Sequence, residues 1–160
     1  MPASPRRPGD DLHITEPLCA VFRRQLKSES LKYTPERARI LDAVVSQPGP
    51  FQAEQLMASL RDSGIRVSKA TVYRTLKLLQ DASILQQILV DPDHAHYVLA
   101  FGRGSLGILA RTDTHQVHEL DLPELNDLRD RLCRRLGLAP ESHRFVVYAR
   151  RDGPPAPSPP

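Results

Sequence analysis

A chain of 160 residues, 40% hydrophobic and 26% charged, has room for one ordinary domain or two small ones, and no apolar run nears the roughly 20 residues that span a bilayer. The first residues lack the apolar stretch of a secretory signal, and two cysteines, Cys19 and Cys133, are too few for a disulfide framework, so we expect a cytoplasmic protein with both thiols reduced and buried. The net charge of +3 is uneven: residues 23–77 hold eleven Lys or Arg against five acidic residues, as suits DNA, RNA or an acidic partner.

Apolar residues recur at helical spacing in the first half of the chain. The expected helices cover residues 16–28, the segment from Pro35 to near Pro48, residues 52–61, and the segment after Ser68. Thr34 and Ser68 are good N-caps for the second and fourth helices, and Gly64 suits the end of the third. Two short helices joined by a turn with glycine are typical of a helix-turn-helix.

The apolar period changes to two after the fourth helix. Residues 84–90 and 94–101 alternate around the turn Asp91-Pro92-Asp93, which predicts a β-hairpin, the wing of a winged helix. The remaining elements expected are a hinge at 102–105, strands at 106–110 and 116–120, a helix from Pro123 to Gly137, and a strand at 144–150.

The predicted fold class is α+β, with an N-terminal winged helix-turn-helix domain at 13–101 and a small C-terminal α/β (β-β-α-β) dimerisation domain at 106–151. The proline-bearing tails at 1–12 and 152–160 are expected to be disordered. We expect the apolar residues of the last helix to face inward, namely Leu125, Leu128, Leu132, Cys133 and Leu136. A unit of about 45 residues has a small core by itself, so we expect a homodimer.

The fourth helix carries side chains that suit the major groove. A helix reads base edges best with its N-terminal half, where backbone N–H groups also favour phosphate. Tyr73 and Arg74 lie there: arginine can bond a guanine edge, and the tyrosine ring can pack on a thymine methyl or bond a phosphate. Lys77 suits a phosphate. The alternative is an exposed helix whose tyrosine and arginine only cover the core.

Three motifs of the first half are informative: Lys32-Tyr-Thr-Pro-Glu-Arg, Ala53-Glu-Gln-Leu and Ala70-Thr-Val-Tyr-Arg. In these motifs the sequence resembles the ferric uptake regulator family, and the likeness extends over about residues 16–150. Members are dimeric bacterial repressors that sense iron, zinc, manganese, nickel, peroxide or heme. The resemblance implies that Tyr73 and Arg74 read the major groove and that Lys32 reaches an A·T-rich minor groove. The DNA-binding residues expected are Lys32, Ser68, Lys69, Thr71, Tyr73, Arg74 and Lys77.

The family's metal ligands are largely missing. Many relatives hold a structural zinc with two CxxC pairs, the first of which would fall near Arg111 and Thr114, and both pairs are absent here. The segment that is rich in histidine in relatives reads Gly104-Ser-Leu-Gly-Ile. Glu119 and His143 do match two family ligands.

Two interpretations of the histidines stay open. His94 and His96 alternate on one wing strand and so face the same side, which suits a non-standard His/Glu site for one divalent metal, zinc or iron. The metal ligands expected are His94, His96, Glu119 and His143, with His115 and His118 as further candidates and heme as a third option. Alternatively, no metal binds, because no short motif supplies three ligands.

The sequence therefore predicts a transcription repressor that binds double-stranded operator DNA as a homodimer, with metal sensing altered or lost. The alternative is a winged-helix module for protein interaction that binds no operator. We do not expect an enzyme or a small-molecule substrate, because the chain lacks a nucleophile elbow, a glycine-rich phosphate loop and a His-Glu-x-x-His helix.

Overall fold

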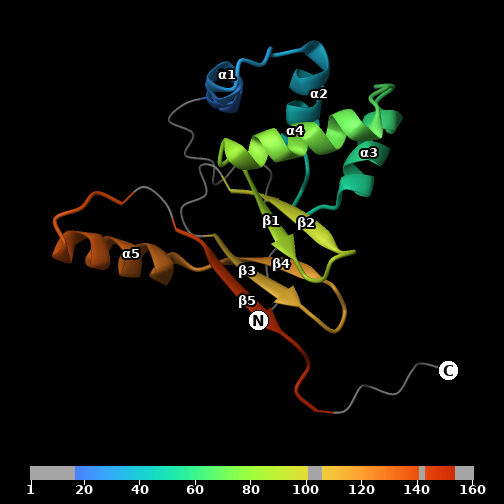
Figure 1. Cartoon of the computed structure of the whole chain (residues 1–160). Coiled ribbons are helices and arrows are strands. Elements are labelled where there is room, and N and C mark those ends of the chain that lie inside the picture. The colour runs from blue at the N-terminus through green and yellow to red at the C-terminus, as the bar shows by residue number, and fades with distance from the viewer. Residues whose placement is uncertain (1–16, 101–105, 141–142, 154–160) are drawn as a thin grey trace.

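The computed structural model describes residues 17–100, 106–140 and 143–153. Within these ranges the chain is α+β, as predicted: four helices and a hairpin precede a β-β-α-β unit (Figure 1). The expected hinge at 102–105 and most of the two expected tails lie outside the described residues. None of the described helices is both long and apolar enough to cross a membrane.

Local capping sets the ends of the N-terminal helices. Thr34 Oγ1 accepts a hydrogen bond from the Arg37 amide at 3.3 Å, and Ser68 Oγ accepts one from the Thr71 amide at 3.1 Å. Gly64 has a φ of 73°, which allows the tight turn between the third and fourth helices. The helices are α1 (Leu18–Ser28), α2 (Pro35–Val45), α3 (Ala53–Asp62) and α4 (Lys69–Asp81).

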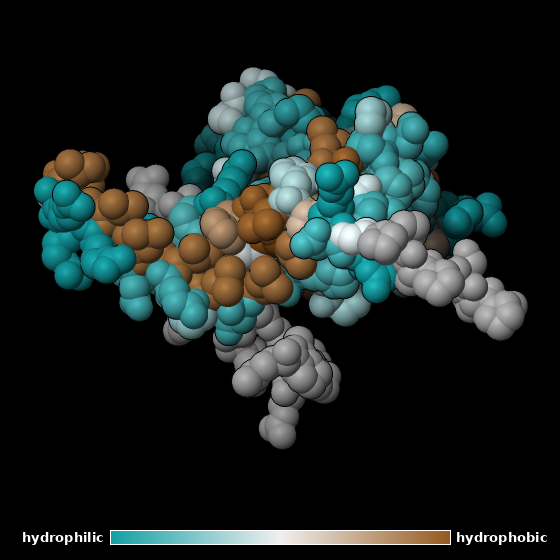
Figure 2. All heavy atoms as spheres, turned by 90° about the horizontal axis from the view of Figure 1, so that it is seen from below, coloured by the Kyte–Doolittle hydropathy of each residue, from teal (hydrophilic) through white to brown (hydrophobic). Residues whose placement is uncertain are grey.

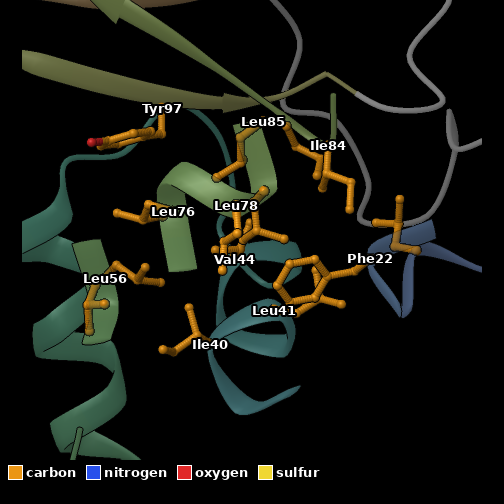
Figure 3. Close-up of a cluster of buried hydrophobic side chains, with 14 of the residues drawn as sticks. Phe22, Ile40, Leu41, Val44, Leu56, Leu76, Leu78, Ile84, Leu85 and Tyr97 are labelled. Atoms are coloured by element: carbon orange, nitrogen blue, oxygen red, sulfur yellow. The ribbon is translucent and has the colours of Figure 1, made fainter. Parts of the chain in front are cut away.

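The four helices pack around the main hydrophobic core (Figure 3). Phe22 of α1, Ile40 of α2 and Leu56 of α3 are each 0% exposed. Val72, Leu76 and Leu79 of α4 are equally buried, which confirms the predicted apolar face of this helix. The inward face of α4 therefore determines which of its polar side chains can face solvent.

A hairpin of β1 (Leu85–Leu89) and β2 (Ala95–Leu99) lies against this core, with Leu85 opposite Leu99. Tyr97 and Leu99 belong to the main core, whereas Val98 between them belongs to a second apolar cluster together with Ile88. Successive side chains of a strand point to opposite faces. The hairpin is therefore buried on both faces.

A three-stranded sheet covers the second face of the hairpin (Figure 1). Its strand order is β4-β3-β5, with β3 antiparallel to β4 and parallel to β5. Ile108 and Ala110 of β3 pack with Ile88 and Val98 of the hairpin. The bounds are β3 (Leu106–Arg111), β4 (Val117–Asp121), α5 (Pro123–Arg135) and β5 (Phe145–Ala149).

The burial predicted for α5 and for the cysteines is wrong in the single chain. Leu128, Leu132 and Leu136 are 44%, 50% and 74% exposed, and no residue of α5 is buried. Cys19 is exposed and Cys133 is half-buried. The reason is that α5 extends away from the helices and the hairpin, so no second layer covers its apolar stripe (Figure 1).

Replacing Leu76 by alanine should lower the free energy of unfolding by roughly 2–5 kcal/mol, because the 0% exposed side chain would leave a cavity in the main core. Urea denaturation followed by circular dichroism measures the change. Leu89→Ala is the control: this side chain is 52% exposed, so its loss should cost less than about 1 kcal/mol. Equal losses of unfolding free energy in the two variants would contradict the assignment of Leu76 to the core.

Candidate nucleic-acid interface and metal-ligating side chains

The N-terminal half of α4 presents a polar surface to solvent. Tyr73 and Arg74 are exposed, whereas Val72 and Thr75 on either side are buried at 0% and 1% exposure. Lys69 at the start of the helix is also exposed. Of the other DNA-binding residues expected from the sequence, those on the surface are Lys32, Ser68 and Lys77, and Thr71 is half-buried.

Tyr73 is held by contacts with α3 and with its own helix. Its hydroxyl donates a hydrogen bond to Glu54 Oε1 of α3 at 3.2 Å, and Lys69 Nζ lies 5.7 Å from its ring centroid. Burial and then the nearby charge of Glu54 raise the pKa of Tyr73, so the hydroxyl stays protonated. A protonated hydroxyl can exchange Glu54 for a phosphate oxygen as its acceptor.

The cations of this surface differ in how they are paired. Lys77 Nζ lies 2.9 Å from Asp81 Oδ1, and this hydrogen bond raises the pKa of Lys77. Because the Lys77 side chain is 70% exposed, the pair adds little stability. Arg74 has no side-chain hydrogen bond or ion pair with any residue that the structure describes. Its guanidinium is therefore available to a ligand.

Lys32 lies in the loop that precedes α2. Arg37 Nη1 donates a hydrogen bond to the carbonyl oxygen of Lys32, which fixes the loop backbone. The side chain of Lys32 is exposed. The loop thus presents a cation to solvent on a backbone that is held in place.

The four residues expected to bind a metal do not form a compact three-ligand group in the part of the chain that the structure describes. His94 lies just before β2, His96 within β2, Glu119 within β4 and His143 just before β5. Among the described residues, no three of these four have ligand atoms within 4.8 Å of one another. Burial lowers the pKa of His96 and, beside Arg129, that of His143, so both imidazoles favour the neutral form.

His94 instead lies beside Asp91 and His115. His94 Nδ1 is 2.7 and 2.8 Å from the two carboxylate oxygens of Asp91, and His115 Nδ1 is 2.8 Å from Asp91 Oδ2. The two imidazole rings stack with their centroids 4.0 Å apart. The hydrogen bond with His94 lowers the pKa of Asp91, so this carboxylate is ionised at neutral pH.

An ion pair occupies the β3–β4 turn, where the family resemblance would place the first cysteine pair. Arg111 donates from Nε and Nη2 to the two oxygens of Asp113 at 3.0 and 2.6 Å. The Arg151 amide donates to Asp113 Oδ2 at 3.2 Å, so the turn is tied to the chain beyond β5. A guanidinium and the Thr114 hydroxyl stand where thiolates would be needed, so these residues do not fit a structural zinc.

Sequence reasoning missed the roles of Asp91, Glu54 and Asp113. Turn chemistry is the only role that the sequence predicts for Asp91, although an acid three residues before a histidine is a local signal of a hydrogen-bonded pair. Asp113 had a similar signal in its separation of two residues from Arg111. No local signal in the sequence predicts the role of Glu54, because its hydrogen-bond donor, the Tyr73 hydroxyl, is nineteen residues away.

The chain is similar in sequence to a known protein family and to its curated members. Residues 28–148 match the Ferric uptake regulator family. The ferric uptake regulation protein of Neisseria meningitidis is 30% identical over 125 residues, which cover 78% of this chain and 86% of that protein.

Two solved structures share the arrangement of the elements. The ferric uptake regulator from Pseudomonas aeruginosa with manganese is similar with a TM-score of 0.66 and 28% identity, covering 83% of this chain and 99% of that one. The Vibrio cholerae ferric uptake regulator, whose DNA-binding domains are described as rearranged, has a TM-score of 0.56 and 25% identity, covering 81% and 98%.

Replacing Asp113 by asparagine should destabilise the fold near pH 6 and have less effect in acid. Its partner Arg111 lowers the pKa of Asp113 from 3.8 to about 2. A pKa that is lower in the folded state means that the ionised carboxylate stabilises the fold fully above about pH 4, and that this contribution is lost as pH falls towards 2.

The urea midpoints of the Asp113→Asn variant and the unchanged protein should therefore differ most near pH 6 and converge below about pH 4. Asp127→Asn, at an exposed position of α5, is the control and should leave the midpoint nearly unchanged across this range. A difference between the urea midpoints of Asp113→Asn and the unchanged protein that widens on acidification would contradict the stabilising role of the Arg111–Asp113 pair.

Proposed function

The chain belongs to the ferric uptake regulator family, and on that premise we propose that it is a homodimeric repressor that reads operator DNA with α4 and differs from its relatives in metal sensing. Family membership makes it a DNA-binding transcription regulator and not an enzyme. The observation that carries the proposal is the Arg74 guanidinium beside Tyr73, which has no side-chain partner among the described residues and lies on the exposed N-terminal half of α4.

The chemistry of this surface suits the major groove. Arg74 can donate two hydrogen bonds to a guanine edge, and Tyr73 can pack on a thymine methyl or donate to a phosphate. Lys69 and Lys77 lie one helical turn before and after this pair and suit phosphate oxygens. Lys32, on its restrained loop, is the cation proposed to reach the minor groove.

A homodimer is supported by apolar surface on the C-terminal unit. In the view of Figure 2 this surface forms a continuous brown band. Large exposed apolar patches mark interaction sites, and among the described strands β5 lies at an edge of its sheet, where a strand of another chain can pair with it. A second copy offers the same patch, as a two-fold interface requires. The exposed residues are Leu128, Leu132, Leu136 and Leu138, followed by Phe145, Val147 and Tyr148.

The two parts of the chain are proposed to have the separate roles expected from the sequence. The winged-helix part at 13–101 would bind DNA, and the part at 106–151 would hold two copies together through α5 and β5. The Arg111–Asp113 pair supports altered metal sensing, because it ties the β3–β4 turn to the chain after β5 without a metal.

Replacing Arg74 by alanine should cost roughly 1–3 kcal/mol of binding to the preferred operator and relax the preference for it. Lys77→Ala should weaken binding to every DNA sequence to a similar extent, since a phosphate contact carries no base information. Selection from a random duplex pool supplies the operator, and fluorescence anisotropy at several salt concentrations measures affinity.

Arg134→Ala is the matched control for this experiment, because Arg134 is an exposed arginine of α5, on the face of this helix opposite its apolar stripe and outside the proposed DNA surface. It should leave DNA affinity unchanged. If Arg74→Ala lowered the affinity for all DNA sequences equally, base readout by this residue would be refuted. Failure of the unchanged protein to bind any duplex would favour a winged-helix module for protein interaction.

Replacing Leu132 by aspartate should convert the dimer into a monomer, because a charge would be buried at the centre of the apolar stripe of α5. Sedimentation velocity measures the change at constant protein concentration. Leu89→Asp is the control, since Leu89 is 52% exposed on the hairpin, away from this stripe. A Leu132→Asp protein that still sediments as a dimer would place the interface elsewhere.

A further inference from the structure

Asp91, His94 and His115 bring three metal-ligating side chains together from two turns that are distant in the sequence. Asp91 and His94 belong to the turn of the β1–β2 hairpin, and His115 belongs to the turn between β3 and β4. One candidate ligand atom from each residue lies within 4.8 Å of the other two. Within the described part of the chain, no other group of three such residues does so.

The contacts within this cluster are not those of a simple hydrogen-bonded pair. His115 Nδ1 lies only 2.8 Å from Asp91 Oδ2, yet it is buried and makes no aligned hydrogen bond among the described residues. His94 Nδ1 already takes a hydrogen-bonding position at the same carboxylate. Two imidazole nitrogens therefore approach one carboxylate, although only one of them is aligned to bond it.

We propose that Asp91, His94 and His115 bind one divalent transition-metal ion, of which zinc is the representative, between the turn of the hairpin and the β3–β4 turn. Two imidazoles and one carboxylate are the donor set of three-ligand zinc sites, with water as the fourth ligand. Imidazole donors also select such metals over magnesium and calcium, which prefer oxygen.

The ligands are held partly in place before a metal binds. The Asp93 amide donates to Asp91 Oδ1 at 2.8 Å, which orients the carboxylate within the turn. His115 has a φ of 59°, a backbone conformation that histidine adopts more readily than most residues. Val90 and Val117, close to the ligands in sequence, pack against the second apolar cluster and hold the two turns together.

Binding requires a limited rearrangement of the two rings. Their planes differ by 11°, so the in-plane lone pairs of the two rings lie in nearly parallel planes, and the side chains must rotate to direct both at one ion. The side chains of His94 and His115 are 40% and 38% exposed, which leaves them room to rotate. The backbone of the two turns can stay in place.

A metal at this site would join the hairpin to the C-terminal sheet by coordination bonds at the edge of the second apolar cluster. The site differs from the His94, His96, Glu119 and His143 set expected from the sequence, with which it shares only His94. It also differs from a cysteine-based zinc site, because its ligands are nitrogen and oxygen. Metal binding itself does not depend on the proposed function, whereas any effect on operator affinity does.

Isothermal titration of zinc into the full-length, chelator-treated protein tests the site, with cobalt absorption as a second readout of coordination. We expect one zinc per chain and visible cobalt bands of a site with low coordination number. His94→Ala, His115→Ala and Asp91→Asn should each weaken zinc binding by at least about tenfold and reduce the cobalt bands. Thermal melts of the metal-free variants establish that each one is folded.

Two control variants locate the bound metal. His118→Ala removes an exposed histidine of β4 outside the cluster and should leave zinc binding unchanged. His143→Ala tests the metal ligands expected from the sequence and should also leave zinc binding unchanged. Absence of stoichiometric zinc, or zinc binding that survives loss of His94 and His115, would overturn the proposal. Operator binding with and without zinc is a separate assay, so failure of the proposed function would leave the metal result intact.

Discussion

The β1–β2 hairpin is the element on which the rest of the structure depends, because it is buried on both faces. Tyr97 and Leu99 complete the core of the four helices, and Val98 between them completes the smaller cluster against β3. Neither apolar cluster is closed without this hairpin. The four N-terminal helices and the C-terminal sheet are therefore positioned by packing on one shared layer as well as by the chain that connects them.

The shared layer also explains where the surface chemistry lies. The buried row of α4 faces the helical core, so Tyr73 and Arg74 are left on the opposite side of that helix. The sheet uses one face for the hairpin, and α5 and β5 keep exposed leucine and aromatic side chains. Basic and apolar surfaces are thus presented by different elements, which suits a protein that contacts DNA and a second copy of itself.

The same packing creates the histidine cluster. The hairpin turn and the β3–β4 turn meet because the strands that lead into them share the second apolar cluster. Asp91 and His94 are three residues apart and could be paired from the sequence, but His115 lies on another strand pair. The expected set of His94, His96, Glu119 and His143 followed strand alternation and family resemblance, and neither determines how two turns pack.

The sequence by itself determined the elements and their order, because their signals are local. Thr34 and Ser68 cap helices within three residues, and the change of apolar period marks the hairpin. It also identified Tyr73 and Arg74 as outward side chains, since the buried row of one helix follows from spacing alone. Only the tertiary structure decided that α5 is uncovered, that the hairpin is buried on both faces, and that His115 lies against Asp91. These features depend on contacts between segments far apart in the chain, and apolar spacing shows which face of an element is apolar without showing whether another segment covers it.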